Sequence, residues 1–163
     1  MRIYGVTGWK NAGKTTLMER LVAEITGRGF TVSAVKHAHH DTDVDQPGRD
    51  SYRHRVAGAG QVLLASPRRW ALMTELRDAR EPTLEELLPR LDPVDLILIE
   101  GYKRAPHPKV EAFRAVNGKP PLSADNDTIR AVAALGEVQT DLPVLDLDDV
   151  ASVADFILRE VGL

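Results

Sequence analysis

The stretch GVTGWKNAGKTT, from Gly5 to Thr16, decides the fold. Within it, Gly8 to Thr15 match the pattern of glycine, four residues, glycine, lysine and serine or threonine, in which backbone amides surround phosphate groups. The β-friendly run Ile3 to Val6 precedes the match, and apolar residues at helical spacing follow it. The stretch therefore predicts a strand, a phosphate-binding loop and a helix, in that order.

Each residue type in this loop suits a phosphate ligand. Gly8 and Gly13 permit backbone angles and a close approach that a side chain would prevent. Lys14 can place a positive charge against the β- and γ-phosphates, and the Thr15 hydroxyl can join the octahedral shell of Mg²⁺. The alternative is a glycine-rich turn that caps a helix. We assign the binding of a nucleoside triphosphate to the residues of this loop: Gly8, Asn11, Ala12, Gly13, Lys14, Thr15 and Thr16.

A second acidic element ends the most apolar segment of the chain, VDLILIEG, from Val94 to Gly101. A nearly all-aliphatic run is typical of a parallel strand that is buried on both faces. Sites for phosphoryl transfer place an acid at the end of such a strand, where it holds magnesium. We expect Glu100 to take this role with Thr15, and Lys14 and Glu100 to be the catalytic pair. The alternative is a solvated carboxylate. Asp95 lies too far back along the strand.

Strand and helix patterns alternate along the chain. Further strands are expected at residues 31–37, 61–65, 71–74, 129–133 and 144–147, and helices at 84–91, starting near Thr83, and at 150–161. Residues 61–74 fit a hairpin around Ser66-Pro67, and residues 104–126 have the composition of a loop. The pattern predicts an α/β fold, a mostly parallel P-loop NTPase-like sheet with helices on both faces, in one domain over residues 1–163.

Composition narrows the class of protein. The chain has 163 residues, a formal charge of -3 and no cysteine. This length suits a single domain with a real core, and the charge gives no sign of a nucleic-acid-binding surface. No apolar run approaches the length of a membrane span, and no signal peptide is visible. We expect a cytoplasmic protein that binds neither nucleic acid nor membrane.

The run KHAHHDTDVDQPGRDSYRHR, from Lys36 to Arg55, concentrates histidines and aspartates. A metal site is one interpretation and a solvated polar loop is another. A third follows from position, because a loop after the second strand opens at the same edge of the sheet as the phosphate loop. Asp50 is also suited to cap a short helix. The residues of a second-ligand loop would be His37, Asp41, Asp45, Arg49 and Asp50, with Arg53 and Arg55 as further anion contacts.

Three blocks together resemble the MobB family, the molybdopterin-guanine dinucleotide biosynthesis adaptor proteins. They are GWKNAGKTTLMERL, AVKHAHHDTDVDQPGRDSYRHRVAGA and DLILIEGYK, and they cover roughly the first two thirds of the chain. The phosphate loop alone is shared by a vast superfamily. The narrower signal is the histidine and aspartate run combined with the Glu-Gly-Tyr-Lys strand end.

The resemblance implies a GTP-binding protein with weak GTPase activity that uses Mg²⁺. It implies a partner, the guanylyltransferase that attaches GMP to molybdopterin, and a cytoplasmic homodimer, with molybdopterin as a further candidate ligand. Two departures limit the transfer of roles. Lys10 does not match the lysine that acts across the dimers of ParA-like relatives, and the Asn-Lys-x-Asp motif that reads guanine is missing. Position alone suggests that Ala124 to Val132 border the base.

Two other functions stay open on the sequence. A small-molecule kinase of the same fold would use Asp41, Asp50 or Glu100 to accept a hydroxyl proton. A metallochaperone-type GTPase would bind a metal such as nickel through His37, His39 and His40. For the leading hypothesis we expect slow GTP hydrolysis at most, because no group in the loop is an obvious catalytic base.

Overall fold

The computed structural model describes residues 1–38 and 43–163 and divides the chain into two compact units. The first comprises residues 1–37 and 88–163, and the second residues 38–87. Each is described by itself below, and the expectation of one domain stays a prediction. None of the helices within the described ranges has the length and apolar character needed to cross a membrane.

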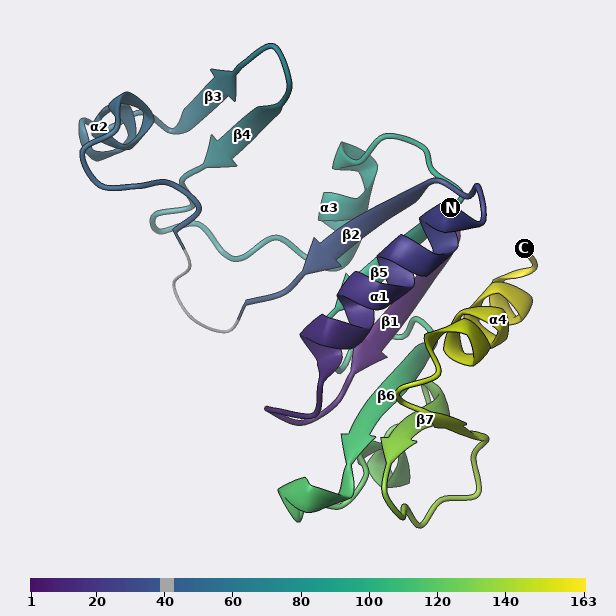
Figure 1. The fold of residues 1–163 in the computed structure, drawn as a ribbon. Coiled ribbons are helices and arrows are strands. Elements are labelled where there is room, and N and C mark those ends of the chain that lie inside the picture. Colours follow the sequence, from purple (N-terminus) through teal and green to yellow (C-terminus); the bar gives the residue numbers. More distant parts are fainter. Residues whose placement is uncertain (39–42) are drawn as a thin grey trace. The chain divides into compact units, whose positions relative to one another are not determined.

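The first unit is built on a six-stranded parallel sheet. In the order β2-β5-β1-β6-β7-β8, the central strand β1 lies between β5 and β6 (Figure 1). All carboxyl ends therefore meet at one edge, which confirms the predicted α/β class. The strands are β1 (Ile3–Thr7), β2 (Val32–Lys36), β5 (Leu96–Glu100), β6 (Lys109–Arg114), β7 (Ile129–Leu135) and β8 (Val144–Asp146).

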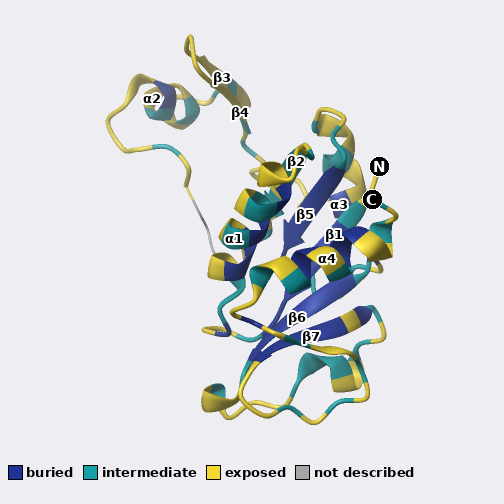
Figure 2. Ribbon diagram, turned by 45° about the vertical axis from the view of Figure 1, so that its right-hand side comes forward, coloured by how far each residue is buried: buried dark blue, intermediate teal, exposed yellow. Residues whose placement is uncertain are grey.

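Two long helices, α1 (Lys14–Gly27) and α4 (Val150–Val161), lie against each other on one face of this sheet (Figure 1). Alternate strand residues point to that face and share a core with the two helices: Tyr4, Val6, Leu96, Leu98, Val110 and Ala112. The dark central strands in Figure 2 show how completely this layer is buried. The unit also has three 3-10 turns, η1 (Leu88–Arg90), η2 (Ala115–Asn117) and η3 (Leu122–Asp125).

Strand β6 corrects the expectation that residues 104–126 form a loop. Its sequence KVEAFR places Lys109 and Glu111 on a strand, where both are fully buried. Buried charges need hydrogen-bond partners. The Lys109 ammonium donates to three oxygens, those of Ala105, His107 and Thr128, and the Glu111 carboxylate accepts from two backbone amides. The strand was missed because the hydrogen-bond partners of its two charged residues are brought to them only by the tertiary fold.

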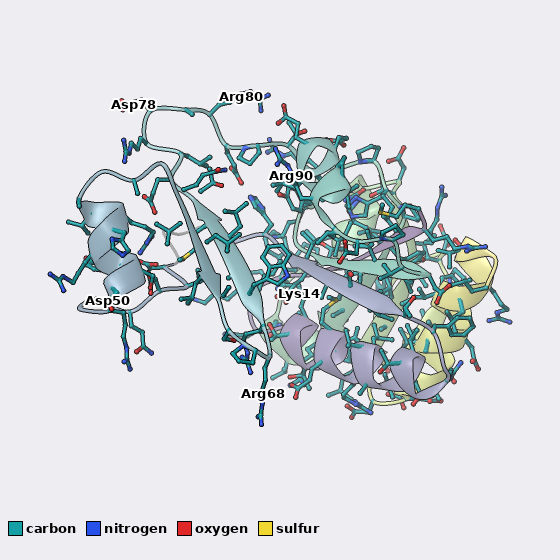
Figure 3. All side chains as sticks on the ribbon, turned by 90° about the horizontal axis from the view of Figure 1, so that it is seen from above. Lys14, Asp50, Arg68, Asp78, Arg80 and Arg90 are labelled. Carbon is teal, nitrogen blue, oxygen red and sulfur yellow. The ribbon has the colours of Figure 1, made fainter. Side chains whose placement is uncertain are left out.

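The second unit contains helix α2 (Asp50–Val56), the antiparallel hairpin of β3 (Gln61–Ala65) and β4 (Trp70–Thr74), and helix α3 (Leu84–Leu87). The hairpin confirms the prediction, and its turn is closed by the Ser66 hydroxyl, which donates to the Arg69 carbonyl at 2.8 Å. Arg68 lies in the same turn (Figure 3). The yellow hairpin in Figure 2 shows that its side chains are mostly exposed.

Helix α3 is shorter than the predicted helix 84–91. Its start was predicted correctly, because the Glu86 amide donates to the Thr83 hydroxyl and the Glu86 carboxylate accepts from the Thr83 amide, a reciprocal capping box. The α-helix ends at Leu87 and a 3-10 turn follows over Leu88–Arg90. Pro89 explains the break, because a proline disfavours helical geometry in the residue before it.

Candidate nucleotide-binding site

The loop between β1 and α1 has the backbone shape that a phosphate cradle needs. Gly8, Asn11 and Gly13 all have positive φ angles, of 144°, 65° and 92°. A Cβ on Gly8 would lie 2.4 Å from the carbonyl oxygen of Ala112, so no larger residue fits beside β6. Because Gly13 precedes the first turn of α1, the loop directs the unpaired amides of a helix N-terminus toward one point.

Glu100 lies where the sequence placed it, at the end of β5 and next to this loop. The Thr15 hydroxyl donates to Glu100 Oε1 at 3.1 Å, and the Glu100 residue is only 9% exposed. Leu96 and Leu98 point to the α1 face, so Glu100, two residues further on, points there too. A hydroxyl beside a carboxylate at a phosphate loop provides two oxygen ligands of the kind that Mg²⁺ prefers.

Lys36 and Lys14 lie near this carboxylate, and Lys103 lies near Lys14. Lys36 Nζ lies 3.7 Å from Glu100 Oε2, and Lys14 Nζ donates to the Trp9 carbonyl at 2.8 Å. Burial lowers the pKa of Lys14, and the neighbouring charges of Lys103 and Lys36 lower it further, while Glu100 opposes them. Lys14, which is labelled in Figure 3, is half-buried at the start of α1. Such a cluster of positive charge suits a polyanion.

Trp9 connects the loop to two other segments. Its indole N–H donates to the Pro120 carbonyl at 2.8 Å, and the Lys103 ammonium lies 5.1 Å from the centre of its ring. Lys103 follows three residues after Glu100, beyond the end of β5. Its contact with the Trp9 ring places it beside the phosphate loop, on the same side of the site as Lys14.

Of the second-ligand residues that the structure describes, only His37 belongs to the unit that carries the phosphate loop. Its amide donates to the Glu100 carbonyl at 2.9 Å, and its ring stacks on Tyr102 with 4.3 Å between centroids. A Cβ on Gly101 would lie 2.9 Å from His37 Cβ, so the left-handed Gly101 leaves room for this histidine. His39, His40 and Asp41 lie outside the described residues.

The remaining residues of that loop belong to the second unit. Asp45 Oδ1 accepts from the Ser51 hydroxyl at 3.0 Å. Asp50 is the first residue of α2 and makes no capping bond, so the start of this helix was predicted correctly but its N-cap is Arg49. Both Arg49 and Asp50 are exposed.

The arginines of this unit are paired with carboxylates. Arg55 contacts Asp43 and Glu75 at 2.7 Å and 2.6 Å, and these hydrogen bonds raise its pKa. Arg53 lies 3.7 Å from Asp50. Arg55 thus links α2 to residues 43 and 75 of the same unit, and its role as an anion contact stays a prediction. In the ranges that the structure covers, no group of three histidine, aspartate or glutamate residues could hold a metal.

Two other sequence predictions concern positions on the sheet: Asp95, and the segment proposed to border the base. Asp95 accepts from the amide and hydroxyl of Thr31 at 2.8 Å and 2.7 Å, at the amino end of β2 and β5, which is the edge opposite to the phosphate loop. Ile129 pairs with Lys109 at the amino end of β6. Val132 is in register with Glu111, and Glu111 with Thr7 at the end of β1, so the border of the base at residues 124–132 stays a prediction.

Two residues near the loop were missed. Lys36 ends β2, and Arg114 ends β6, with its Nε 3.3 Å from the position of a Cβ on Gly13. Both are the last residues of strands parallel to β1, which places them at the carboxyl edge. The end of β2 was predicted within one residue, so Lys36 could have been found. Arg114 could not, because β6 was not predicted.

Known proteins share this chain's sequence and fold. The family model for molybdopterin guanine dinucleotide synthesis protein B matches residues 3–135. The molybdopterin-guanine dinucleotide biosynthesis adapter protein of Escherichia coli is 44% identical, over 93% of this chain and 88% of its own. That of Haemophilus influenzae is 40% identical, over 95% and 86%. Crystal structures of MobB from Bacillus subtilis and of a Bacillus stearothermophilus homologue superpose with TM-scores of 0.77 and 0.69, at 27% and 28% identity. Each alignment covers 99% of this chain, and 98% and 99% of the structures.

Proposed function

Since the chain belongs to the MobB family, we propose that it is an adapter protein of molybdopterin-guanine dinucleotide biosynthesis that binds GTP with Mg²⁺. Its partner is the guanylyltransferase that attaches GMP to molybdopterin, and the protein is cytoplasmic. Relatives that align over most of their length carry the adapter name, which supports the pathway. The proposal that the protein binds GTP and Mg²⁺ is supported by the geometry of the site around the phosphate loop.

The observation that carries the nucleotide site is the contact between Thr15 and Glu100 beside the phosphate loop. Mg²⁺ bound there would take oxygens from both side chains or from their waters, and the triphosphate would take the loop amides. Lys14 would exchange the Trp9 carbonyl for a phosphate oxygen, with Lys36 and Lys103 nearby to balance the remaining charge.

Slow hydrolysis follows from the same geometry. Glu100 is engaged with Thr15, and the described part of the loop offers no second carboxylate that could orient an attacking water. Magnesium and Lys14 stabilise charge on the phosphates, but rapid hydrolysis also needs a positioned water and an arginine finger. We therefore propose a nucleotide-binding accessory protein, with a weak GTPase activity at most.

The hairpin of the second unit supports the proposed homodimer. Four large apolar side chains on its two strands are between 46% and 66% exposed: Leu63, Leu64, Trp70 and Leu72. Leu63 and Leu64 are consecutive, so they point to opposite faces. A two-stranded hairpin is only marginally stable alone, and a second copy of this chain would cover its exposed faces and edges.

The test is a side-by-side calorimetric titration of GTP, ATP, GDP and ADP with and without magnesium. We expect tight binding of GTP that depends on magnesium, and formation of molybdopterin-guanine dinucleotide that is faster when the protein is added to the guanylyltransferase. Stoichiometric transfer of the γ-phosphate to a metabolite would favour the kinase instead. Tight nickel binding would favour the metallochaperone.

A further inference from the structure

Arg114 is a positively charged residue at the phosphate loop that the proposed function does not use. It is the last residue of β6, the strand beside β1 (Figure 1), and it points to the α1 face like Val110 and Ala112 before it. Its Nε and one Nη lie 3.3 Å and 3.4 Å from where a Cβ on Gly13 would be. The guanidinium therefore packs against the loop itself.

This packing places the guanidinium close to a backbone amide that a phosphate would use. In any residue the Cβ and the amide nitrogen are about 2.5 Å apart, because both are bonded to Cα. The Arg114 Nε therefore lies at most about 6 Å from the Gly13 nitrogen. A phosphate oxygen that accepts from this amide would lie about 3 Å from the nitrogen. The long arginine side chain can reach a phosphate in that position.

The buried Nε of Arg114 has no hydrogen-bond acceptor within residues 1–38 and 43–163. Buried donors are nearly always paired. A water molecule does not replace the missing acceptor, because the space that Arg114 lines with Trp9 and Phe113 is too small for one. Arg55, by comparison, has carboxylate partners for its guanidinium. The Nε of Arg114 therefore gives up no protein acceptor when the guanidinium turns to a ligand.

Two carboxylates on the neighbouring strands are engaged elsewhere. Glu111 lies on the opposite face of β6, where its carboxylate accepts from two backbone amides. Glu100 lies across β1, on β5, and accepts from the Thr15 hydroxyl. Neither of them neutralises Arg114, and an arginine in a protein keeps its positive charge. An anionic ligand at the loop would balance that charge.

We propose that Arg114 binds the β-phosphate of the nucleotide from the β6 side of the loop. Glu100 and Thr15 hold the metal on the β5 side, so Arg114 faces the phosphates from the side away from the metal. Lys14 and Arg114 then share the charge of the β-phosphate, which nucleoside diphosphates and triphosphates both carry. This inference rests on the proposed nucleotide site. It adds a contact that depends neither on the base, nor on the γ-phosphate, nor on magnesium.

Calorimetric titrations of Arg114→Met and Arg114→Lys test this contact. Arg114→Met keeps an unbranched stem and loses the charge, so affinity for GTP should fall about 10-fold to 140-fold, as for a lost hydrogen bond to a charged group. Affinities for GDP and ATP should fall by the same factor, with and without magnesium. Arg114→Lys keeps the charge without the planar fork, so it should lose less than Arg114→Met.

Arg159→Met and Arg159→Lys are the matched controls, because Arg159 is exposed near the carboxyl end of α4. The next turn of the chain there is bonded to Arg2 at the start of β1, which is the edge opposite to the phosphate loop. Both controls should bind GTP, GDP and ATP like the unchanged protein. Losses in the controls that match those of the Arg114 variants would show a general effect of charge and overturn the proposal.

Urea denaturation without ligand separates binding from a structural role. Because Arg114→Met removes an unpaired buried donor, its midpoint should match or exceed that of the unchanged protein. A lower midpoint would make Arg114 a structural residue and overturn the proposal. Unchanged affinity overturns it too, as does a loss confined to GTP, which would place Arg114 at the γ-phosphate. If the unchanged protein binds neither GTP nor GDP, the proposed function fails as well, whereas equally tight binding by Arg114→Met removes this inference alone.

Discussion

The Thr15 hydroxyl donates to Glu100 Oε1 across 3.1 Å, which joins the first turn of α1 to the end of β5. Replacing Glu100 by Gln removes the negative charge and keeps the shape. We expect binding of GTP with magnesium to weaken at least about tenfold, because a neutral amide is a poor partner for Mg²⁺. Binding without magnesium should change far less.

Paired titrations with magnesium and with a chelator measure this difference. The exposed Glu137→Gln provides a control that removes the same charge elsewhere. If Glu100→Gln binds GTP as the unchanged protein does, both with magnesium and with the chelator, Glu100 has no part in metal binding.

Lys14→Ala separates binding from stability. Lys14 makes one hydrogen bond to the Trp9 carbonyl, but its burial near Lys36 and Lys103 lowers its pKa and offsets that gain. We expect the free energy of unfolding to change by less than about 1 kcal/mol. Affinity for GTP should fall at least about tenfold, since a charged contact to two phosphates is lost. Chemical denaturation measures the free energy of unfolding and calorimetry measures the affinity for GTP. Lys10→Ala, at an exposed lysine, is the control. Unchanged affinity contradicts the assignment.

Glu111→Gln tests the tie between β6 and η3. The carboxylate accepts from the amides of Leu122 and Ser123 at 2.7 Å and 2.9 Å. A glutamine can accept from only one of them and turns its own N–H₂ toward the other. We expect a loss of about 1–3 kcal/mol in unfolding free energy, as for a buried unsatisfied donor. Urea denaturation measures it, and a variant as stable as the parent would show that the bonds contribute nothing.

Lys109 predicts an unusual dependence of stability on pH. Burial lowers its pKa to about 8, from an ordinary value of 10.5. Between these values the unfolded chain binds more protons than the folded one, so the free energy of unfolding should rise with pH. Burial raises the pKa of Tyr4, which makes the free energy of unfolding fall with pH, but only above pH 10. Denaturation from pH 8 to about 9.5 should show the rise, and Lys109→Met should reduce it. A profile that falls in the parent would contradict the assignment.

Leu63→Asp tests the dimer. Leu63 is 62% exposed and pairs across the hairpin with Leu72, so the change places a charge on an apolar face without opening a core. Light scattering should show a dimer for the parent and a monomer for the variant. Thr74→Asp, on an exposed residue of the same hairpin, serves as the control. A variant that stays dimeric at the same concentration places the interface elsewhere.

The sequence predicted the parts of the site that depend on local pattern. The phosphate loop has a fixed spacing, and β5 is nearly all aliphatic because it is buried on both faces. Strand β6 could not be predicted, because Lys109 and Glu111 resemble loop residues until Thr128, Leu122 and their neighbours supply partners. Missing β6 also hid Arg114, its last residue. The pairing of Arg55 with Asp43 and Glu75 could not be predicted either, because those partners are brought together only by the fold of the second unit.

A crystal structure with Mg²⁺ and a non-hydrolysable GTP analogue tests the central claim most directly. The β-phosphate should accept hydrogen bonds from the amides of Gly13, Lys14 and Thr15, with the metal between the phosphates and the Thr15 and Glu100 side chains. Lys14 should have left the Trp9 carbonyl. A loop that holds only water at saturating analogue, with Lys14 still on that carbonyl, would contradict the account.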